Sequence, residues 1–239
     1  MFHTMRLGFE KANILSNILN FMASFDAIFT LNQDTLLELQ YLNQDLRTRS
    51  QGRLFGAEMP GLTKAGTAPD YAPPGYFKPA NGPYSVKERY QPIFKLHGSS
   101  NWALPDETNL MLILGGDKAS EIPKQPLLKW YFEEFDRRLA GSRVVIIGYS
   151  FGDEHINESL RKAAISGARF FIIDPRGVDI IENLATGFAH IPTSSQNWLH
   201  NALSKNIDGA SRRSLNTTFS DDDIEYTKIN HFMTRHMRK

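Results

Sequence analysis

The segment from Ser142 to Pro175 constrains the fold more than any other part of the chain. It begins with a continuous apolar run, Val144 to Ile147, and passes through a glycine-bearing loop into a helical pattern that ends at Gly167. A second apolar run, Phe170 to Ile173, follows. Continuous apolar runs on both sides of a helix are typical of parallel strands that are buried on both faces. The segment therefore predicts a βαβ unit and an α/β fold.

Weaker patterns extend this prediction over the rest of the chain. Apolar residues at helical spacing predict an amphipathic helix over 12–22 and a second helix, closed by Gly141, over about 126–140. The sequence "FDAIFTLNQDTLLELQYL" predicts a strand, a polar loop and a helix, and "PIFKLHG" and "NLMLILGG" predict further strands. Short helices are expected at about 178–184 and 196–203, and a last one from about 222. Together these patterns predict an α/β fold built on a parallel sheet.

The region from about 47 to 90 differs in character. It contains "PGLTKAGTAPDYAPPGYFKPANGPY", which is dense in Pro, Gly and Tyr and has no periodicity. Excursions of this length inside a compact domain are uncommon and are usually functional or mobile. We expect one domain over 1–192 that contains this excursion, followed by a helical extension over 193–239.

Composition excludes several classes of function. The 27 basic and 26 acidic residues give a formal net charge of +1, which creates no global field for nucleic acid or an anionic membrane surface. The chain has no cysteine, which excludes disulfides, Cys-ligated zinc and a thiol nucleophile and agrees with a reducing compartment. We find neither the ~20 apolar residues of a membrane span nor the pattern of a signal peptide. We expect a cytoplasmic protein, and its oligomeric state stays open.

Candidate functional residues lie where predicted strands end, because parallel sheets bind ligands beyond the carboxyl ends of their strands. In "GYSFGD", Gly148 would let backbone amides approach a phosphate and Ser150 offers a hydroxyl. An ordinary connection, with Asp153 capping the next helix, explains this loop equally well. In "IDP", Asp174 could accept hydrogen bonds from a ribose, although an acid before proline is more often a turn residue.

Two further strand ends carry polar residues. In "TLNQD", Asn32 and Asp34 follow a strand that ends at Thr30, so one side chain could face a cleft while the other caps the next helix. In "KLHGS", His97 precedes Gly98, and taken alone such a histidine is more often a core or surface residue that donates to a carbonyl.

The order and spacing of "FTLNQDTLLE", "KLHGSSNW" and "VVIIGYSFGDEHINESL…FFIIDP" resemble the sirtuin-like NAD-consuming domains over Phe21 to Pro175. The resemblance is strongest to the bacterial branch found in anti-phage defence proteins. The intervening "LGGDKASEIPKQPLLKWYFEEF" is also typical of that branch.

This resemblance implies a Rossmann-like parallel sheet with helices on both faces. It also implies cleavage of the bond between nicotinamide and ribose, with NAD or an ADP-ribose-type nucleotide as the ligand. By the resemblance, Asn32 holds the ribose and the attacking water, Asp34 recognises the nicotinamide amide, and His97 is the general base. An imidazole suits that role because its pKa lies near neutrality.

The resemblance also implies a set of residues that contact NAD. Thr30 and Gly98 flank the catalytic pair, and Gly148 and Ser150 match the loop that approaches the phosphates and ribose. Asp174 lies where the family binds the adenosine ribose, although sirtuins usually have asparagine there.

Two departures from the family pattern matter. Protein deacylases of the family carry a four-cysteine zinc module where this chain has its Pro/Gly-rich excursion, so we expect no zinc and favour NAD hydrolysis over deacylation. A glycine-rich GAGxS turn is also missing, because "MFHTMRLGFEK" offers only Gly8. We therefore expect weak NAD binding or dependence on a partner, and a catalytically silent nucleotide-binding module or a degenerate fragment stays an alternative.

Overall fold

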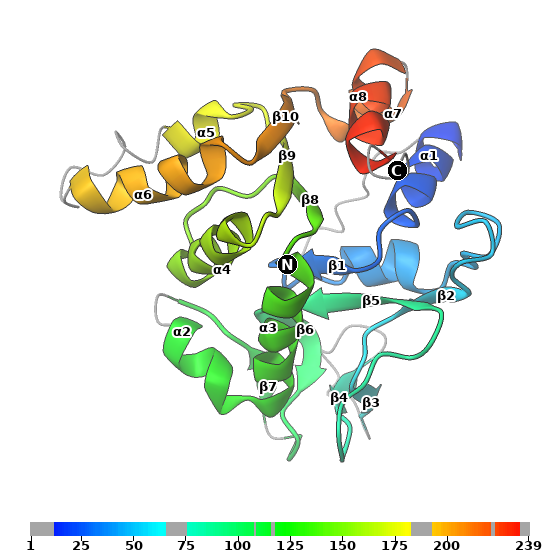
Figure 1. The fold of residues 1–239 in the computed structure, drawn as a ribbon. Coiled ribbons are helices and arrows are strands. Elements are labelled where there is room, and N and C mark those ends of the chain that lie inside the picture. Colours follow the sequence, from blue (N-terminus) through cyan, green and yellow to red (C-terminus); the bar gives the residue numbers. More distant parts are fainter. Residues whose placement is uncertain are drawn as a thin grey trace, which may run out of the picture. The chain divides into compact units, whose positions relative to one another are not determined.

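The computed structural model describes residues 12–65, 76–107, 109–115, 118–182, 193–220 and 223–234 (Figure 1). The chain divides into two compact units. We name them by their place in the sequence. The central unit is Ile18–Glu134, and the terminal unit consists of the described parts of Met1–Asn17 and Phe135–Lys239.

A parallel sheet in the central unit carries two of the predicted strand ends. Its strands are β1 (Ile28–Thr30), β5 (Tyr90–Lys95) and β2 (Gly56–Glu58), in the order β1-β5-β2. The register pairs Ile28 with Ile93 and Thr30 with Lys95. Because β1 and β5 are parallel and in this register, the loops that follow them leave the sheet at the same edge.

A mixed sheet in the same unit includes the strand that begins directly after His97. It consists of β3 (Leu62–Lys64), β4 (Phe77–Pro79), β6 (Gly98–Ala103) and β7 (Leu110–Leu112), in the order β3-β4-β6-β7. Strand β6 pairs with β4 in parallel and with β7 in antiparallel fashion. The histidine therefore lies in the tight turn between two strands of different sheets.

Aromatic side chains form much of the core of the central unit. This unit contains η1 (Glu38–Leu42), a π-helix, together with α2 (Lys118–Glu121) and η2 (Ile122–Lys124), and parts of α1 (Ala12–Met22) and α3 (Pro126–Leu139). The rings of Phe94 and Tyr131 lie edge to face with centroids 4.9 Å apart, and Trp102 meets Tyr131 at 6.0 Å. The Tyr131 hydroxyl donates to the Pro60 carbonyl at 2.7 Å, so the polar end of this buried side chain has a hydrogen-bond partner inside the core.

The terminal unit contains the predicted βαβ segment. Strands β8 (Arg143–Ile147) and β9 (Arg169–Ile173) are parallel and are joined by α4 (Glu154–Ile165). Strand β10 (Ile207–Ser211) pairs with the other side of β9, which gives the order β10-β9-β8. The prediction of burial on both faces is confirmed for β9 but is wrong for β8, where Ile147 is 42 % exposed. Within the described part of this unit, β8 lies at the edge of the sheet.

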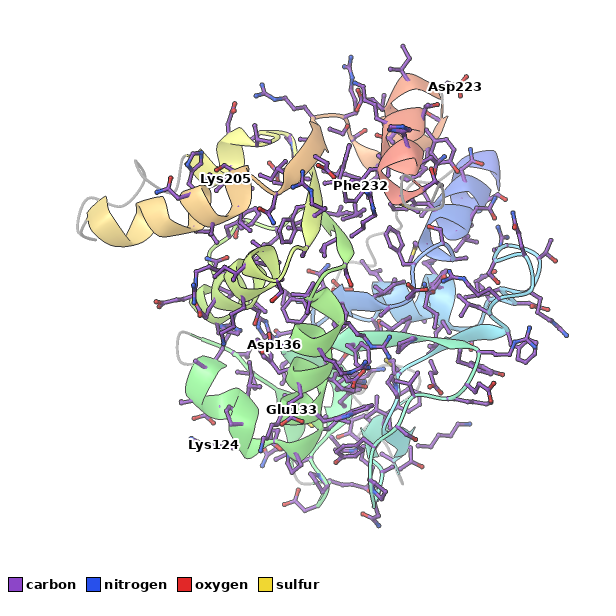
Figure 2. All side chains as sticks on the ribbon, in the orientation of Figure 1. Lys124, Glu133, Asp136, Lys205, Asp223 and Phe232 are labelled. Carbon is purple, nitrogen blue, oxygen red and sulfur yellow. The ribbon has the colours of Figure 1, made fainter. Side chains whose placement is uncertain are left out.

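Helices complete the terminal unit. They are α5 (Asp179–Glu182), α6 (Thr193–Ser204), α7 (Leu215–Ser220) and α8 (Asp223–Thr234). Phe232 of α8, which Figure 2 labels, packs its ring 5.6 Å from that of Phe171 on β9. Arg143 donates to the Phe232 carbonyl and lies 4.9 Å from the centre of its ring, which joins α8 to the sheet.

The α/β fold with parallel strands is confirmed, as are the helix expected over 12–22 and the one expected over about 126–140, which spans Pro126–Leu139. The parallel strands are divided between a three-stranded sheet in each unit. Sequence interpretation missed β2, β3 and β4 in the excursion, whose residues 66–75 lie outside the described residues, β6 directly after His97, and β10 in a polar stretch. These strands are three to six residues long and are fixed by their pairing partners, which a local pattern does not reveal. The division into a domain over 1–192 and an extension over 193–239 stays a prediction.

Candidate functional site

Two loops meet at the carboxyl edge of β1 and β5. Thr30 and Lys95 are paired in the register, so Asn32 and His97 each lie two residues beyond the paired ends. The Leu96 N–H donates to the Thr30 carbonyl at 3.0 Å, which continues the β1-β5 pairing into the loops. The geometry thereby brings the two polar motifs of the sequence to one place in the central unit.

Gln33 fixes the two loops to each other. Its side-chain amide donates to the carbonyls of His97 at 3.3 Å and Ile113 at 2.6 Å. Its own carbonyl accepts from the Ser100 N–H at 2.8 Å. Sequence reasoning missed this residue, although its place between two candidate residues in "TLNQD" was the available signal.

His97 is buried, with 2 % of its surface exposed. Its carbonyl accepts from the Ile113 N–H at 3.0 Å, so the main chain of the turn is held by β7 and its continuation. Gly98 has a φ of +76°, and a Cβ there would come within 2.9 Å of the Met111 carbonyl carbon and closer still to its oxygen. This close backbone approach explains the glycine without any ligand.

The polar residues of the first loop are exposed. Asn32 is exposed and donates its N–H to the Thr30 hydroxyl at 3.1 Å. Asp34 accepts the Leu36 N–H on Oδ1 at 2.9 Å. The capping interpretation of Asp34 therefore accounts for one of its two carboxylate oxygens.

A buried charged pair lies beneath this loop. The Lys95 ammonium group is 2.6 Å from Oε1 of Glu38, and the two side chains are 1 % and 7 % exposed. It also donates to the Ser99 hydroxyl at 2.7 Å and to the Asp34 carbonyl. Burial lowers the pKa of Lys95, and the neighbouring Glu38 carboxylate opposes that shift. Sequence reasoning missed the pair, since lysine and glutamate are by default surface residues.

The second group of predicted site residues lies in the terminal unit. Gly148 follows β8 directly, and its N–H donates to the Ile173 carbonyl at 3.0 Å. It has a φ of +59° with open space where a Cβ would be, and Ser150 is exposed. Phe151 has a φ of +56° and is buried, so the "GYSFGD" loop adopts an unusual backbone that a buried ring holds in place.

Hydrogen bonds from α4 hold the same loop. The Tyr149 hydroxyl lies 2.9 Å from Oδ1 of Asn157 and 3.0 Å from the Asp153 carbonyl, and Asn157 Nδ2 donates to the Phe151 carbonyl at 2.8 Å. Burial raises the pKa of Tyr149, which keeps its hydroxyl a donor. Asp153 occupies the N-cap position of α4 but makes no side-chain capping bond, so the capping interpretation of this loop is wrong.

Asp174 lies just beyond β9. Its N–H donates to the Ser211 carbonyl at 3.1 Å, and its Oδ1 accepts the Arg176 N–H at 2.9 Å. The interpretation of Asp174 as a turn residue therefore accounts for the contact of its Oδ1. The carboxylate is largely buried and has the Arg176 guanidinium at 3.7 Å.

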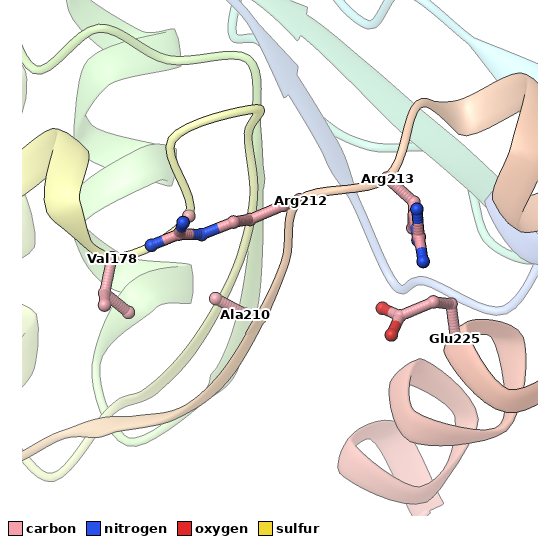
Figure 3. Close-up of a pocket in the computed structure, with 6 residues that line it drawn as sticks. Val178, Ala210, Arg212, Arg213 and Glu225 are labelled. Atoms are coloured by element: carbon pink, nitrogen blue, oxygen red, sulfur yellow. The ribbon is translucent and has the colours of Figure 1, made fainter.

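A hollow of about 470 Å³ lies beyond the carboxyl ends of β9 and β10 (Figure 3). Arg212, directly after β10, extends toward Val178 in this view and pairs with Asp179 at 2.6 Å. The lining residues are Gly177, Val178, Ala210, Arg212, Arg213 and Glu225. Gly177, which lines the hollow, follows Asp174 by three residues in the chain, so the hollow and Asp174 lie at the same edge of the sheet.

The predicted residues thus form two groups, each at the carboxyl edge of a parallel sheet. The central unit holds Thr30, Asn32, Asp34, His97 and Gly98. The terminal unit holds Gly148, Ser150 and Asp174.

Comparison with protein families identifies the domain that contains these predicted residues. A family model described as a SIR2-like domain matches residues 26–187, more than half of the 239-residue chain. The chain belongs to the SIR2-like family. The matched range contains both groups of site residues, and membership relates the domain to NAD. No curated protein and no solved structure gives a significant match to the SIR2-like chain.

The described residues were considered for groups that could hold a metal ion and for helices that could span a membrane. In those residues, no group of three or more histidines and carboxylates is placed to hold a metal ion, and the sequence has no cysteine. None of the helices in the described ranges is long and apolar enough to cross a membrane.

Proposed function

We propose that this SIR2-like domain is an NAD⁺ glycohydrolase that cleaves the bond between nicotinamide and ribose. The observation that carries the proposal is the joining of the Asn32 loop to the His97 turn through Gln33 at one edge of the sheet. This arrangement occurs in a member of a family related to NAD. The family resemblance supplies the roles of the residues.

The reaction needs a water molecule and a base. In the proposed step, the water oxygen forms a bond to the ribose carbon while the bond from that carbon to the nicotinamide nitrogen breaks, and the bonding electrons leave with nicotinamide. His97 accepts the proton that the water loses, and Asn32 holds the ribose and the water. Asp34 accepts a hydrogen bond from the nicotinamide amide.

The terminal group would bind the other end of NAD⁺. Gly148 leaves room for a phosphate, because no atom outside its chain neighbours lies within 4 Å of the position of its missing side chain. Its own N–H donates to the Ile173 carbonyl, so the phosphate would take its hydrogen bonds from other donors. Ser150 offers an exposed hydroxyl, and Asp174 offers a carboxylate to the adenosine ribose.

We also propose that the reaction serves defence against phage in the cytoplasm. The resemblance to the bacterial branch supports the defence role, and the absence of cysteine agrees with a reducing compartment. Plating phage on cells that express the wild type or His97→Ala tests this role. Equal plaque numbers would contradict it.

The burial of His97 favours a second candidate, a nucleotide-binding module without turnover. A general base must reach the proton that it takes, and His97 is 2 % exposed. Calorimetry with NAD⁺ and ADP-ribose separates the two candidates. Heat of binding without nicotinamide release would favour the module.

Nicotinamide release from NAD⁺ by the purified chain tests the leading proposal. We expect the wild type to release nicotinamide and His97→Ala to lose about 10²–10⁴-fold in rate, the usual contribution of a general base. His200→Ala, a histidine on α6 outside the predicted site, is the matched control and should keep the wild-type rate. An acetylated peptide added to the same reaction should stay acetylated, since the sequence lacks the cysteines of a zinc module. Equal rates in wild type and His97→Ala would remove His97 from the mechanism.

A further inference from the structure

We propose that Lys95 is a positioning residue for the site, which together with Glu38 holds the main chain of the loop that carries Asn32 and Asp34. This inference rests on the proposed function for its catalytic consequence. The hydrogen bonds themselves do not depend on that function.

The ammonium group of Lys95 has three donors and three partners. They are the carbonyl of Asp34, Oε1 of Glu38 at 2.6 Å and the hydroxyl of Ser99 at 2.7 Å. These partners come from the loop after β1, from η1 and from β6. One buried side chain on β5 therefore joins the three segments that surround the candidate site.

The Ser99 hydroxyl is oriented for this contact. It donates to Oδ1 of Asn101 at 2.7 Å, so its lone pairs are left to accept from Lys95. Both Ser99 and Asn101 are buried, at 0 % and 2 % exposure. A network of this kind fixes the ammonium position within the unit.

Stability alone is a poor explanation for the pair. Removing two charges from water is costly, and apolar residues of similar volume often serve a core as well or better. The second oxygen of Glu38, Oε2, is buried without a hydrogen-bond partner among the described residues. The contacts that an apolar pair could not reproduce are the bonds from Lys95 to the Ser99 hydroxyl and to the Asp34 carbonyl, and the second of these reaches the site loop.

That bond acts on the residues that the proposed reaction uses. The Gln33 carbonyl is held by the Ser100 N–H, and the next carbonyl, that of Asp34, is held by Lys95. Together they fix the backbone directly after Asn32 and at Asp34. Displacement of a positioning group by about 1 Å can reduce a rate on the order of 10²-fold.

A charge-free variant tests the inference. Lys95→Met combined with Glu38→Leu removes both charges at once, so no lone charge stays buried. Tyr41→Phe is the matched control, since the hydroxyl of Tyr41 bonds η1 to β5 through Gln91 and not to the site loop.

Amide hydrogen exchange is the first measurement. We expect exchange at the N–H groups of Leu36 and Ser100, which bond to the loop, to become at least tenfold faster in the charge-free variant. The control should leave both within about twofold of the wild type after correction for global stability. Unchanged exchange at both amides in the charge-free variant would overturn the proposal, whether or not the wild type cleaves NAD⁺.

Steady-state NAD⁺ cleavage is the second measurement. We expect kcat/KM to fall at least tenfold in the charge-free variant at an unchanged denaturation midpoint, and less than twofold in Tyr41→Phe. Equal losses in the two variants would overturn the proposal. If the wild type releases no nicotinamide, the proposed function fails and the exchange result alone decides the role of Lys95. Should the first variant not fold, Lys95→Leu with Glu38→Met carries the same two measurements.

Discussion

Replacement of Gly98 by alanine should destabilise the central unit far more than the same change at an open glycine. Gly98 has a φ of +76°, a conformation that costs an ordinary residue about 1–2 kcal/mol. An added Cβ would also meet the Met111 carbonyl, with its carbon at 2.9 Å and the Leu112 Cα at 3.2 Å. Forced displacement in a packed core costs roughly 1–3 kcal/mol more. We therefore expect Gly98→Ala to lower the free energy of unfolding by about 2–5 kcal/mol.

Gly52 provides the matched control in the same unit. Its φ of +79° is nearly the same, but no atom lies within 4 Å of its missing Cβ. Gly52→Ala should cost only the conformational part, about 1–2 kcal/mol. Urea denaturation followed by far-UV circular dichroism compares the two variants, with equal slopes as the condition for comparing their midpoints. Equal losses would refute the close approach of β6 and β7 at this turn.

Two further predictions concern other parts of the molecule. Tyr41→Phe should lower the free energy of unfolding by about 1–3 kcal/mol in urea denaturation, because the buried Gln91 side-chain oxygen loses the hydroxyl that lies 2.5 Å from it. A change below about 0.5 kcal/mol would contradict this bond. The hydrogen bond from Lys228 lowers the pKa of Glu225 below its ordinary 4.5, so its carboxylate stabilises the folded state above that pH and loses the effect as the pH falls through the lowered pKa. Denaturation of wild type and Glu225→Gln from pH 7 to pH 3 should show the advantage of the wild type shrinking below about pH 4.5, and a constant difference would contradict the assignment.

The parts of the fold that sequence predicted are those with long periodic patterns. The helix over 12–22 repeats its apolar residues at helical spacing, and the βαβ segment combines two apolar runs with a glycine stop at Gly167. The local pattern and the packing agree for α4 and β9, whereas β8 forms as predicted but leaves Ile147 exposed. Strand β10 could not be predicted this way, because "IDGAS" is polar and contains a glycine. It forms a strand because β9 offers a partner.

The candidate site was predictable as a set of positions but not as a set of environments. The rule that parallel sheets bind ligands at their carboxyl edges singled out Asn32 and His97 as residues that follow strands, and the structure shows that these strands are neighbours. It could not show that His97 is buried, since burial depends on the turn into β6. Nor could it find the Lys95 and Glu38 pair, because the chain brings together a strand and a π-helix that are distant in sequence.

The most direct test of the account is the conversion of NAD⁺ by the purified protein, with both products measured. We predict that the wild type releases nicotinamide and ADP-ribose in a one-to-one ratio, and that His97→Ala releases both about 10²–10⁴-fold more slowly while remaining folded at the assay temperature. A folded wild type that binds NAD⁺ and leaves it intact, or a His97→Ala variant as fast as the wild type, would contradict it.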